Sequence, residues 1–283
     1  MEVSQTISSV RENVRAARKQ GRTIGLVPTM GALHAGHISL VEAAKKKCDY
    51  VVVSIFVNHT QFGPTEDFEK YPRPIEDDLQ KCEQAGVDLV FNPTANEMYP
   101  EKVITWVNVE EITDHLCGLS RPGHFRGVTT VCAKLFNIVT PDFAFFGQKD
   151  AQQAIVIKRM VSDLNMPLEI VVCPIVREKS GLALSSRNKY LSESEREDAA
   201  YIYKSLQKCR EMVDSGCRNT ETIINEMRNI LEQKKSIKIE YVSIVDEKTL
   251  ENTDYIKSRA LAAVAVKIGT TRLIDNFPLD ING

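Results

Sequence analysis

Two histidines in one short turn are the residues whose types and spacing point most directly to chemistry. His34 and His37 close the run Pro-Thr-Met-Gly-Ala-Leu-His-Ala-Gly-His at residues 28–37, which follows the apolar stretch 23–27. Apolar residues then recur with helical spacing, so the run is predicted to be a strand-to-helix turn. Its glycines let the backbone approach a ligand, and the first N–H groups of a helix bind anions. Imidazoles on one face of that turn can donate hydrogen bonds to phosphate oxygens, so the turn predicts a nucleotide phosphate site.

Two other roles are open to these histidines. A histidine near a helix start is often a cap or a surface residue, and a His-x-x-His pair can also hold a metal ion. A metal site needs a third ligand, and none is evident near residues 34–37.

Further polar residues follow two later strands of the predicted sheet. Asn58 and Gln61 come after the predicted strand Tyr50–Val57, and their amides suit the hydroxyl and carboxylate groups of a small substrate. Lys149 and Asp150 come after the predicted strand Phe143–Phe146, as a candidate phosphate cation and a candidate ribose acceptor. Taken alone, an Asn/Gln loop is more often turn chemistry, and a Lys-Asp pair is ordinarily a solvated turn.

Two basic loops add to this set. Ser185, Ser186 and Arg187 follow Gly181, and two hydroxyls with a guanidinium make a phosphate grip, although serine-rich turns are common. The loop 121–127 carries Arg121 and a histidine that could equally be an ordinary loop residue.

Strands and helices are predicted to alternate through the first part of the chain, which is typical of an α/β fold with a right-handed parallel sheet. Ligands of such sheets bind beyond the carboxyl ends of the strands, where His34 would lie. The other predicted strands are Ile24–Val27, Asp88–Phe91 and Glu169–Cys173, and the helices are Ile38–Lys47, Glu76–Ala85, Val128–Val139 and Ala151–Leu164.

The pattern changes beyond about Val176. Two charged amphipathic helices precede three short strands, so a smaller C-terminal α+β domain is expected, with domains at residues 1–175 and 176–283. The predicted elements are the helices Glu193–Ser215 and Thr220–Lys234 and the strands Ile239–Val245, Leu261–Lys267 and Thr271–Ile274.

Bulk composition narrows the class of protein. The 283 residues carry a formal net charge of −2, which gives no general attraction to nucleic acid. No apolar run of about 18 residues and no basic leader occur, so no membrane association and a cytoplasmic location are expected. Seven scattered cysteines without a Cys-x-x-Cys pair fit neither a disulfide framework nor a zinc site, and most should be small buried hydrophobes.

Taken together, these motifs resemble those of the pantothenate synthetase family. The resemblance runs in order and spacing from about Thr23 to Leu191 and continues more weakly to Asn276. It rests on residues 28–37, Ser-Ile-Phe-Val-Asn at 54–58, Gln-Phe-Gly-Pro at 61–64, Tyr-Pro-Arg at 71–73, Arg-Pro-Gly-His-Phe at 121–125, Phe-Gly-Gln-Lys-Asp-Ala-Gln-Gln at 146–153 and Ser-Ser-Arg-Asn at 185–188.

The resemblance implies a Rossmann-like domain that binds ATP and pantoate, and a second domain that closes over ATP. It implies an ATP-dependent condensation of pantoate with β-alanine through an acyl adenylate, giving pantothenate, AMP and pyrophosphate. Magnesium would arrive on the ATP phosphates without dedicated protein ligands, no organic prosthetic group is implied, and the family is commonly homodimeric.

The resemblance also implies residue roles. The catalytic residues would be His34, His37, Lys149 and Arg187, and pantoate or β-alanine would contact Gln61, Gln153, Met30, Asn58 and Arg121. The ATP-binding residues would be Met30, Gly31, Ala32, Leu33, His34, Ala35, Gly36, His37, Gly147, Gln148, Lys149, Asp150, Val176, Leu184, Ser185, Ser186 and Arg187.

One departure from the family pattern concerns the second loop, where His59 stands in place of the usual proline after Asn58.

Four alternative functions are considered for the chain as a whole. A transferase that stops at a nucleotidyl product would not explain Gln61 and Gln153. A tRNA synthetase would need a tRNA-reading domain, an inactive regulator would not need the intact histidines, and an NAD-dependent oxidoreductase would need Gly-x-Gly-x-x-Gly in the first turn.

Overall fold

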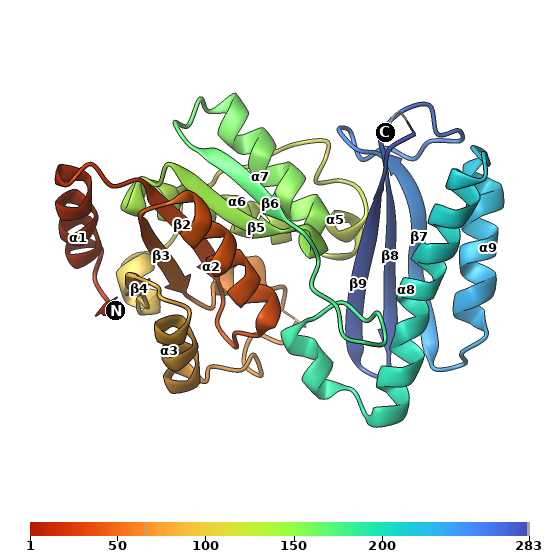
Figure 1. Cartoon of the computed structure of the whole chain (residues 1–283), viewed down its shortest axis with the longest axis horizontal. Coiled ribbons are helices and arrows are strands. Elements are labelled where there is room, and N and C mark those ends of the chain that lie inside the picture. The colour runs from red at the N-terminus through yellow and green to blue at the C-terminus, as the bar shows by residue number, and fades with distance from the viewer. Residues whose placement is uncertain (65, 282–283) are drawn as a thin grey trace. The chain divides into compact units, whose positions relative to one another are not determined.

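Six parallel strands form the sheet that positions the histidine turn (Figure 1). In this computed structural model, which describes residues 1–64 and 66–281, their order is β1-β4-β3-β2-β5-β6. From β2 the chain continues to β3 and β4 on one side, whereas β5 and β6 lie on the other, so β2 and β5 flank the point where the strand order reverses. The strands are β1 Glu2–Ser4, β2 Ile24–Thr29, β3 Tyr50–Ile55, β4 Leu89–Phe91, β5 Phe143–Gly147 and β6 Glu169–Cys173.

Both faces of this sheet are buried, and residues along each strand alternate between two cores. Leu26 and Val52 belong to one apolar cluster, whereas Val27 and Val53 belong to the other. The first cluster takes most of its helical residues from α1 (Ile7–Lys19), α6 (His124–Val139) and α7 (Ala151–Asp163). The second takes them from α2 (Ala35–Lys47) and α3 (Ile75–Gln84). This double burial explains why the strands are apolar on both faces.

The remaining short elements lie in the connections. They are the helices α4 (Ala95–Met98) and α5 (Cys117–Ser120) and the 3-10 turns η1 (His59–Gln61) and η2 (Gln148–Asp150).

A second unit is built on the antiparallel sheet β7-β8-β9. Its core joins that sheet to two helices through residues spaced three or four apart, such as Ile202, Leu206 and Cys209. The elements are η3 Ser186–Tyr190, α8 Glu193–Asp214, α9 Thr220–Glu232, β7 Ile237–Asp246, β8 Ala260–Ile268 and β9 Thr271–Leu279.

The two units divide the chain in an interleaved way. The first comprises residues 1–110, 120–148 and 153–174, and the second comprises residues 111–119, 149–152 and 175–283. The last boundary between the units lies between residues 174 and 175, one residue before the domain boundary expected between 175 and 176. The two short segments 111–119 and 149–152 were expected within residues 1–175, and contacts assign them to the second unit.

The α/β fold class is confirmed, with three local differences from the predicted elements. The sequence pattern did not predict β1 or α1. The strand expected at Thr271–Ile274 runs on to Leu279, because its alternate residues stay buried against β8. Helix α6 begins at His124, four residues before the expected start.

Two further expectations can be compared with the structure. No helix in the described part of the chain is long and apolar enough to cross a membrane. Six of the seven cysteines are buried and Cys217 is half-buried, and all seven are free thiols. Burial raises the pKa of Cys82 and of Cys132 to about 12, as expected for thiols that act as core residues.

Candidate active site

His34 and His37 form a reciprocal cap at the start of α2. The Nδ1 atom of His34 accepts the Gly36 N–H at 3.1 Å, and the Nδ1 atom of His37 accepts the His34 N–H at 3.3 Å. The ring centroids lie 4.1 Å apart with the planes tilted by 41°. Because each Nδ1 is an acceptor, the neutral form of each ring carries its proton on Nε2. Capping the helix and donating to a phosphate are therefore compatible roles for these histidines. The caps use Nδ1, which fixes the tautomer with the proton on Nε2.

A buried carboxylate holds the loop before this cap. Asp78 on α3 is 1% exposed and accepts the N–H groups of Ala32 and Leu33, both at 2.7 Å. Lys81, one turn later, donates to the Leu33 carbonyl at 3.0 Å. Gly31 has φ +83°, and a Cβ there would lie 3.0 Å from an Asp78 oxygen, so the close approach requires glycine. The loop that carries His34 is thus fixed from a separate helix.

Asn58 and Gln61 interact with each other in the next loop. The Asn58 amide nitrogen donates to the Gly127 carbonyl at 3.2 Å and to the Gln61 Oε1 at 3.1 Å, while its Oδ1 accepts from Tyr99 and Thr60. Because a carbonyl can only accept, the Gly127 contact fixes the orientation of the Asn58 amide. That orientation in turn directs the Gln61 amide nitrogen to the Met30 sulfur at 3.2 Å.

The Met30 contact has a chemical consequence for Gln61. A thioether is a weak acceptor, so a substrate oxygen can replace it at little cost. Asn58 is 1% exposed, and its four hydrogen bonds orient Gln61. Direct contact of Asn58 with a substrate stays a prediction.

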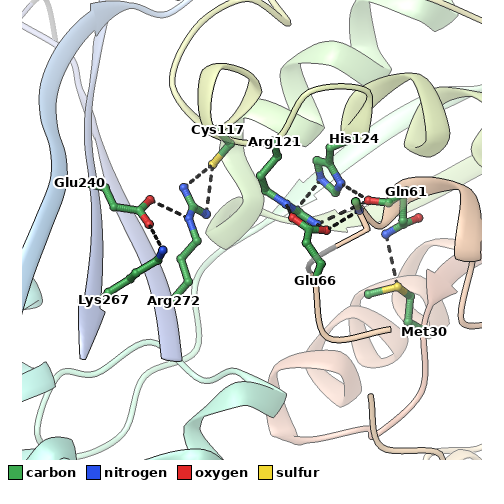
Figure 2. A network of polar contacts seen from close by, with 10 residues as sticks. Met30, Gln61, Glu66, Cys117, Arg121, His124, Glu240, Lys267 and Arg272 are labelled. Atoms are coloured by element: carbon green, nitrogen blue, oxygen red, sulfur yellow. Dashed lines mark hydrogen bonds and ion pairs between the residues drawn. The ribbon is translucent and has the colours of Figure 1, made fainter. Parts of the chain in front are cut away.

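Arg121 belongs to an ion pair beside this amide (Figure 2). Its guanidinium donates to both carboxylate oxygens of Glu66, at 2.6 and 2.8 Å, and its third nitrogen lies 2.9 Å from His124 Nε2. Burial would raise the pKa of Glu66, but the hydrogen bonds and charge of Arg121 outweigh it and hold that pKa below its ordinary value. Arg121 therefore makes contacts that organise the loop, and its contact with substrate stays a prediction.

Lys149 and Asp150 lie in the second unit, where the last strand holds them. The Lys149 Nζ lies 3.6 Å from an Asp150 oxygen, and the Asn276 amide donates to the Lys149 carbonyl at 2.9 Å. Asn276 is 4% exposed and follows Asp275, whose carboxylate pairs with both terminal nitrogens of Arg177 at 2.6 and 3.0 Å. The backbone of the candidate phosphate lysine is thus tied to β9.

The glutamines that follow Asp150 differ in their contacts. The buried Gln152 accepts from the Cys117 N–H and donates to the carbonyls of Ile112 and His115, so it clamps segment 111–119. Cys117 in turn lies 3.7 Å from both terminal nitrogens of Arg272 on β9 (Figure 2). Gln153 is half-buried, and no hydrogen bond of its side chain is found within the described residues.

A short hairpin brings two predicted ATP-binding residues together in the second unit. The Leu184 N–H donates to the Val176 carbonyl at 2.9 Å, and the turn between them closes at Gly181, with φ +92°. A Cβ on Gly181 would overlap the Tyr203 ring, so this position requires glycine. Ser185 then caps η3 by accepting the Arg187 N–H at 3.3 Å, and Ser186 is buried.

His59 packs where the family pattern has proline. Its ring meets Tyr99 edge-on, with centroids 5.0 Å apart, and lies 6.4 Å from the Phe68 ring. Asn58 before it has φ −81° and ψ 107°, which is the extended geometry that a following proline would require. The loop therefore keeps the expected backbone shape, and aromatic packing takes part in holding it.

The predicted site residues fall into two groups. Residues 30–37, Asn58, Gln61, Arg121, Gly147, Gln148 and Gln153 belong to the first unit. Lys149, Asp150, Val176 and residues 184–187 belong to the second. Within the described residues, no three His, Cys, Asp or Glu side chains gather as a metal-binding cluster.

Three residues that organise these groups were not recognised from the sequence. Asp78 stood in an ordinary Asp-Asp pair, Glu66 carried no motif, and Asn276 was noted only as part of a weak C-terminal resemblance. Their partners lie about 45, 55 and 127 residues away in the chain, so local pattern holds no signal for them.

Comparison with known proteins agrees with this geometry over almost the whole chain. Residues 2–278 match the family described as pantoate-beta-alanine ligase. A pantothenate synthetase of Acetivibrio thermocellus is 55% identical over 281 residues, covering 99% of this chain and 100% of that protein. One from Thermoanaerobacter pseudethanolicus is 56% identical over 277 residues, covering 98% of each.

Solved structures extend the agreement to the fold. A pantothenate synthetase structure from Thermus thermophilus has a TM-score of 0.94 and 43% identity, covering 98% of this chain and 99% of that one. A pantoate-beta-alanine ligase from Francisella tularensis, complexed with beta-gamma ATP and beta-alanine, has a TM-score of 0.81 and 38% identity, covering 98% and 97%. These matches, together with the histidine turn and the oriented Gln61 amide, show that the chain belongs to the pantoate-beta-alanine ligase family.

Proposed function

We propose that this chain condenses pantoate with β-alanine at the expense of ATP, through a pantoyl adenylate. A pantoate carboxylate oxygen attacks the α-phosphorus, and the bond from that phosphorus to pyrophosphate breaks. The β-alanine amine then attacks the acyl carbon, the bond to AMP breaks, and the amine loses a proton as the amide of pantothenate forms. ATP enters as its magnesium complex, so the metal arrives with the substrate.

The observation that carries the proposal is the fixed tautomer of the two histidines. Both rings carry a proton on Nε2 in the neutral form, and both lie at the positive end of a 13-residue helix. Such donors stabilise charge that develops on phosphate oxygens during displacement at phosphorus. His34 and His37 are therefore assigned to the α-phosphate and the departing pyrophosphate.

The remaining roles follow from side-chain chemistry. The Gln61 amide nitrogen exchanges its weak sulfur partner for a pantoate oxygen, and Met30 lines the apolar side of pantoate. Gln153 supplies a second amide for pantoate. Lys149, Ser185, Ser186 and Arg187 supply charge and hydroxyl donors to the ATP phosphates. Gly147, Asp150 and Val176 contact the nucleoside.

Two finer points rest on the family resemblance. We propose a homodimer, for which light scattering should return twice the mass of the chain. A cytoplasmic location is proposed as well, and fractionation of the source cells tests it.

The deciding experiment separates the two half-reactions. With pantoate and ATP but no β-alanine, the chain should exchange labelled pyrophosphate into ATP, and net AMP release should require β-alanine. Pantoate labelled with ¹⁸O in its carboxylate should pass one labelled oxygen to AMP. Absence of pantoate-dependent exchange together with unlabelled AMP would show that no pantoyl adenylate forms.

A further inference from the structure

We propose that His124 is a positioning residue that holds Gln61 in its pantoate-binding arrangement through a hydrogen bond to the Gln61 backbone carbonyl. This inference rests on the proposed function, because it takes Gln61 as the pantoate contact. Figure 2 shows the ring between the Arg121 guanidinium and the Gln61 backbone.

The neighbours of the ring fix its tautomer. Arg121 can only donate, so His124 Nε2, at 2.9 Å from a guanidinium nitrogen, must be an acceptor. The ring proton therefore sits on Nδ1, which lies 2.9 Å from the Gln61 carbonyl oxygen and donates to it. This tautomer is the opposite of the one that His34 and His37 adopt at their own helix.

The charges around the ring act in both directions, because the Glu66 carboxylate attracts a positive ring while the helix start and Arg121 oppose it. His124 is the first residue of the 16-residue helix α6, where the helix dipole disfavours a cation. Arg121 already takes both carboxylate oxygens of Glu66, and it would meet a protonated Nε2 donor to donor. Within η1, the turn that packs against α6, the titratable side chain is His59, whose ring lies against Tyr99 and Phe68. Protonation of His124 would therefore break the Arg121 contact but leave the Nδ1 proton on the Gln61 carbonyl.

The hydrogen bond from His124 to the Gln61 backbone also affects the Gln61 side chain, because the turn η1 packs tightly against α6. A Cβ on Gly127, one turn into α6, would overlap the Thr60 carbonyl oxygen, so the helix and η1 touch at backbone distance. The Gly127 carbonyl also accepts from Asn58, which orients the Gln61 amide. His124 and Gly127 thus hold the same turn from one helix, and movement of that turn changes where the Gln61 amide points.

The test compares the pantoate KM of variants with that of the full-length wild type from pH 8 to pH 5.5. His124→Ala should raise the pantoate KM about tenfold at pH 8, the value of one lost hydrogen bond, with a smaller change in kcat. The ratio of variant to wild-type KM should stay well above one down to pH 5.5, because a protonated ring still donates from Nδ1 to the Gln61 carbonyl.

Two further variants separate positioning from bulk stability. His124→Asn keeps a donor near the Nδ1 position, so its KM should stay within about threefold of wild type across the pH range. His59→Asn removes a histidine from the same loop but keeps the His124 hydrogen bond, so its KM should rise less than that of His124→Ala.

Two results would overturn the inference. One is a His124→Ala pantoate KM within about twofold of the wild-type value in an enzyme that otherwise turns over pantoate. The other is ¹⁵N NMR showing the His124 proton on Nε2 at pH 8. The NMR measurement needs no substrate, so it judges the tautomer even if the wild type forms no pantoyl adenylate, which would contradict the proposed function instead.

Discussion

At the scale of single residues, His34 both caps α2 and presents its Nε2 donor. The two roles can be separated, because capping uses Nδ1 only. Asparagine is among the best N-cap residues and offers a side-chain oxygen to the same N–H, but it cannot supply the Nε2 donor.

Two substitutions of His34 should therefore separate its contribution to stability from its contribution to kcat. His34→Ala should lose about 0.5–2 kcal/mol of stability and at least about 10²-fold in kcat, with a smaller loss of ATP affinity. His34→Asn should keep most of the stability and show the same loss of kcat. Urea unfolding and steady-state kinetics on both variants measure the two effects. Full activity in His34→Asn would reduce the histidine to a cap.

Residue chemistry was the part of the site most open to prediction from sequence. Residues 30–37 and Gln61 could be proposed as site residues because their types suit the chemistry. The tautomers of His34 and His124 could not, because they depend on which partner faces each ring nitrogen. The orientation of the Asn58 amide likewise depends on the Gly127 carbonyl, 69 residues away.

At the scale of elements, helix α3 positions the histidine turn through one carboxylate. Asp78 accepts the consecutive N–H groups of Ala32 and Leu33. Ala32 has φ +51°, a strained geometry for a residue with a Cβ. Two short hydrogen bonds to a buried carboxylate can support such a conformation.

Removing one acceptor should loosen that turn. Asp78→Asn turns an NH₂ group toward one of the two backbone N–H groups, which should cost about 1–3 kcal/mol of stability. Displacement of the turn should lower kcat by about tenfold or more. Asp77→Asn is the matched control, since Asp77 is exposed in the same helical turn and should change neither value appreciably. Equal behaviour of the two variants in denaturation and kinetics would contradict the anchoring role.

Strongly patterned elements were predicted within a few residues, whereas α1 and β1 were not. The buried face of α1 consists only of Val10, Val14 and Ala17 among charged residues, and β1 has three residues. Such short apolar patterns become informative only once the sheet that covers them is known. The assignment of segments 111–119 and 149–152 to the second unit has the same origin, because it depends on tertiary contacts such as those of Gln152.

At the scale of the whole molecule, the interleaved chain links the stability of the two units. Helix α7 begins in the second unit and continues in the first, and Gln152 in its first turn clamps segment 111–119. Unfolding of α7 therefore removes that clamp. Cys117 then loses the backbone support that holds its sulfur 3.3 Å from the Tyr241 hydroxyl and beside Arg272. Each unit has its own apolar core, and we expect unfolding of α7 in the first to weaken the second through loss of the Gln152 contacts.

Buried thiols offer a measurement of this linkage. Cys132 lies in the core of the first unit and Cys209 in that of the second, and burial raises the pKa of both to about 12. Both should resist a thiol reagent in the native state, whereas the half-buried Cys217 should react first. In pulsed labelling across a urea series, read by mass spectrometry, Cys132 and Cys209 should become reactive at midpoints within about 0.3 M urea of each other. Midpoints about 1 M or more apart would show that the cores unfold independently despite the shared helix.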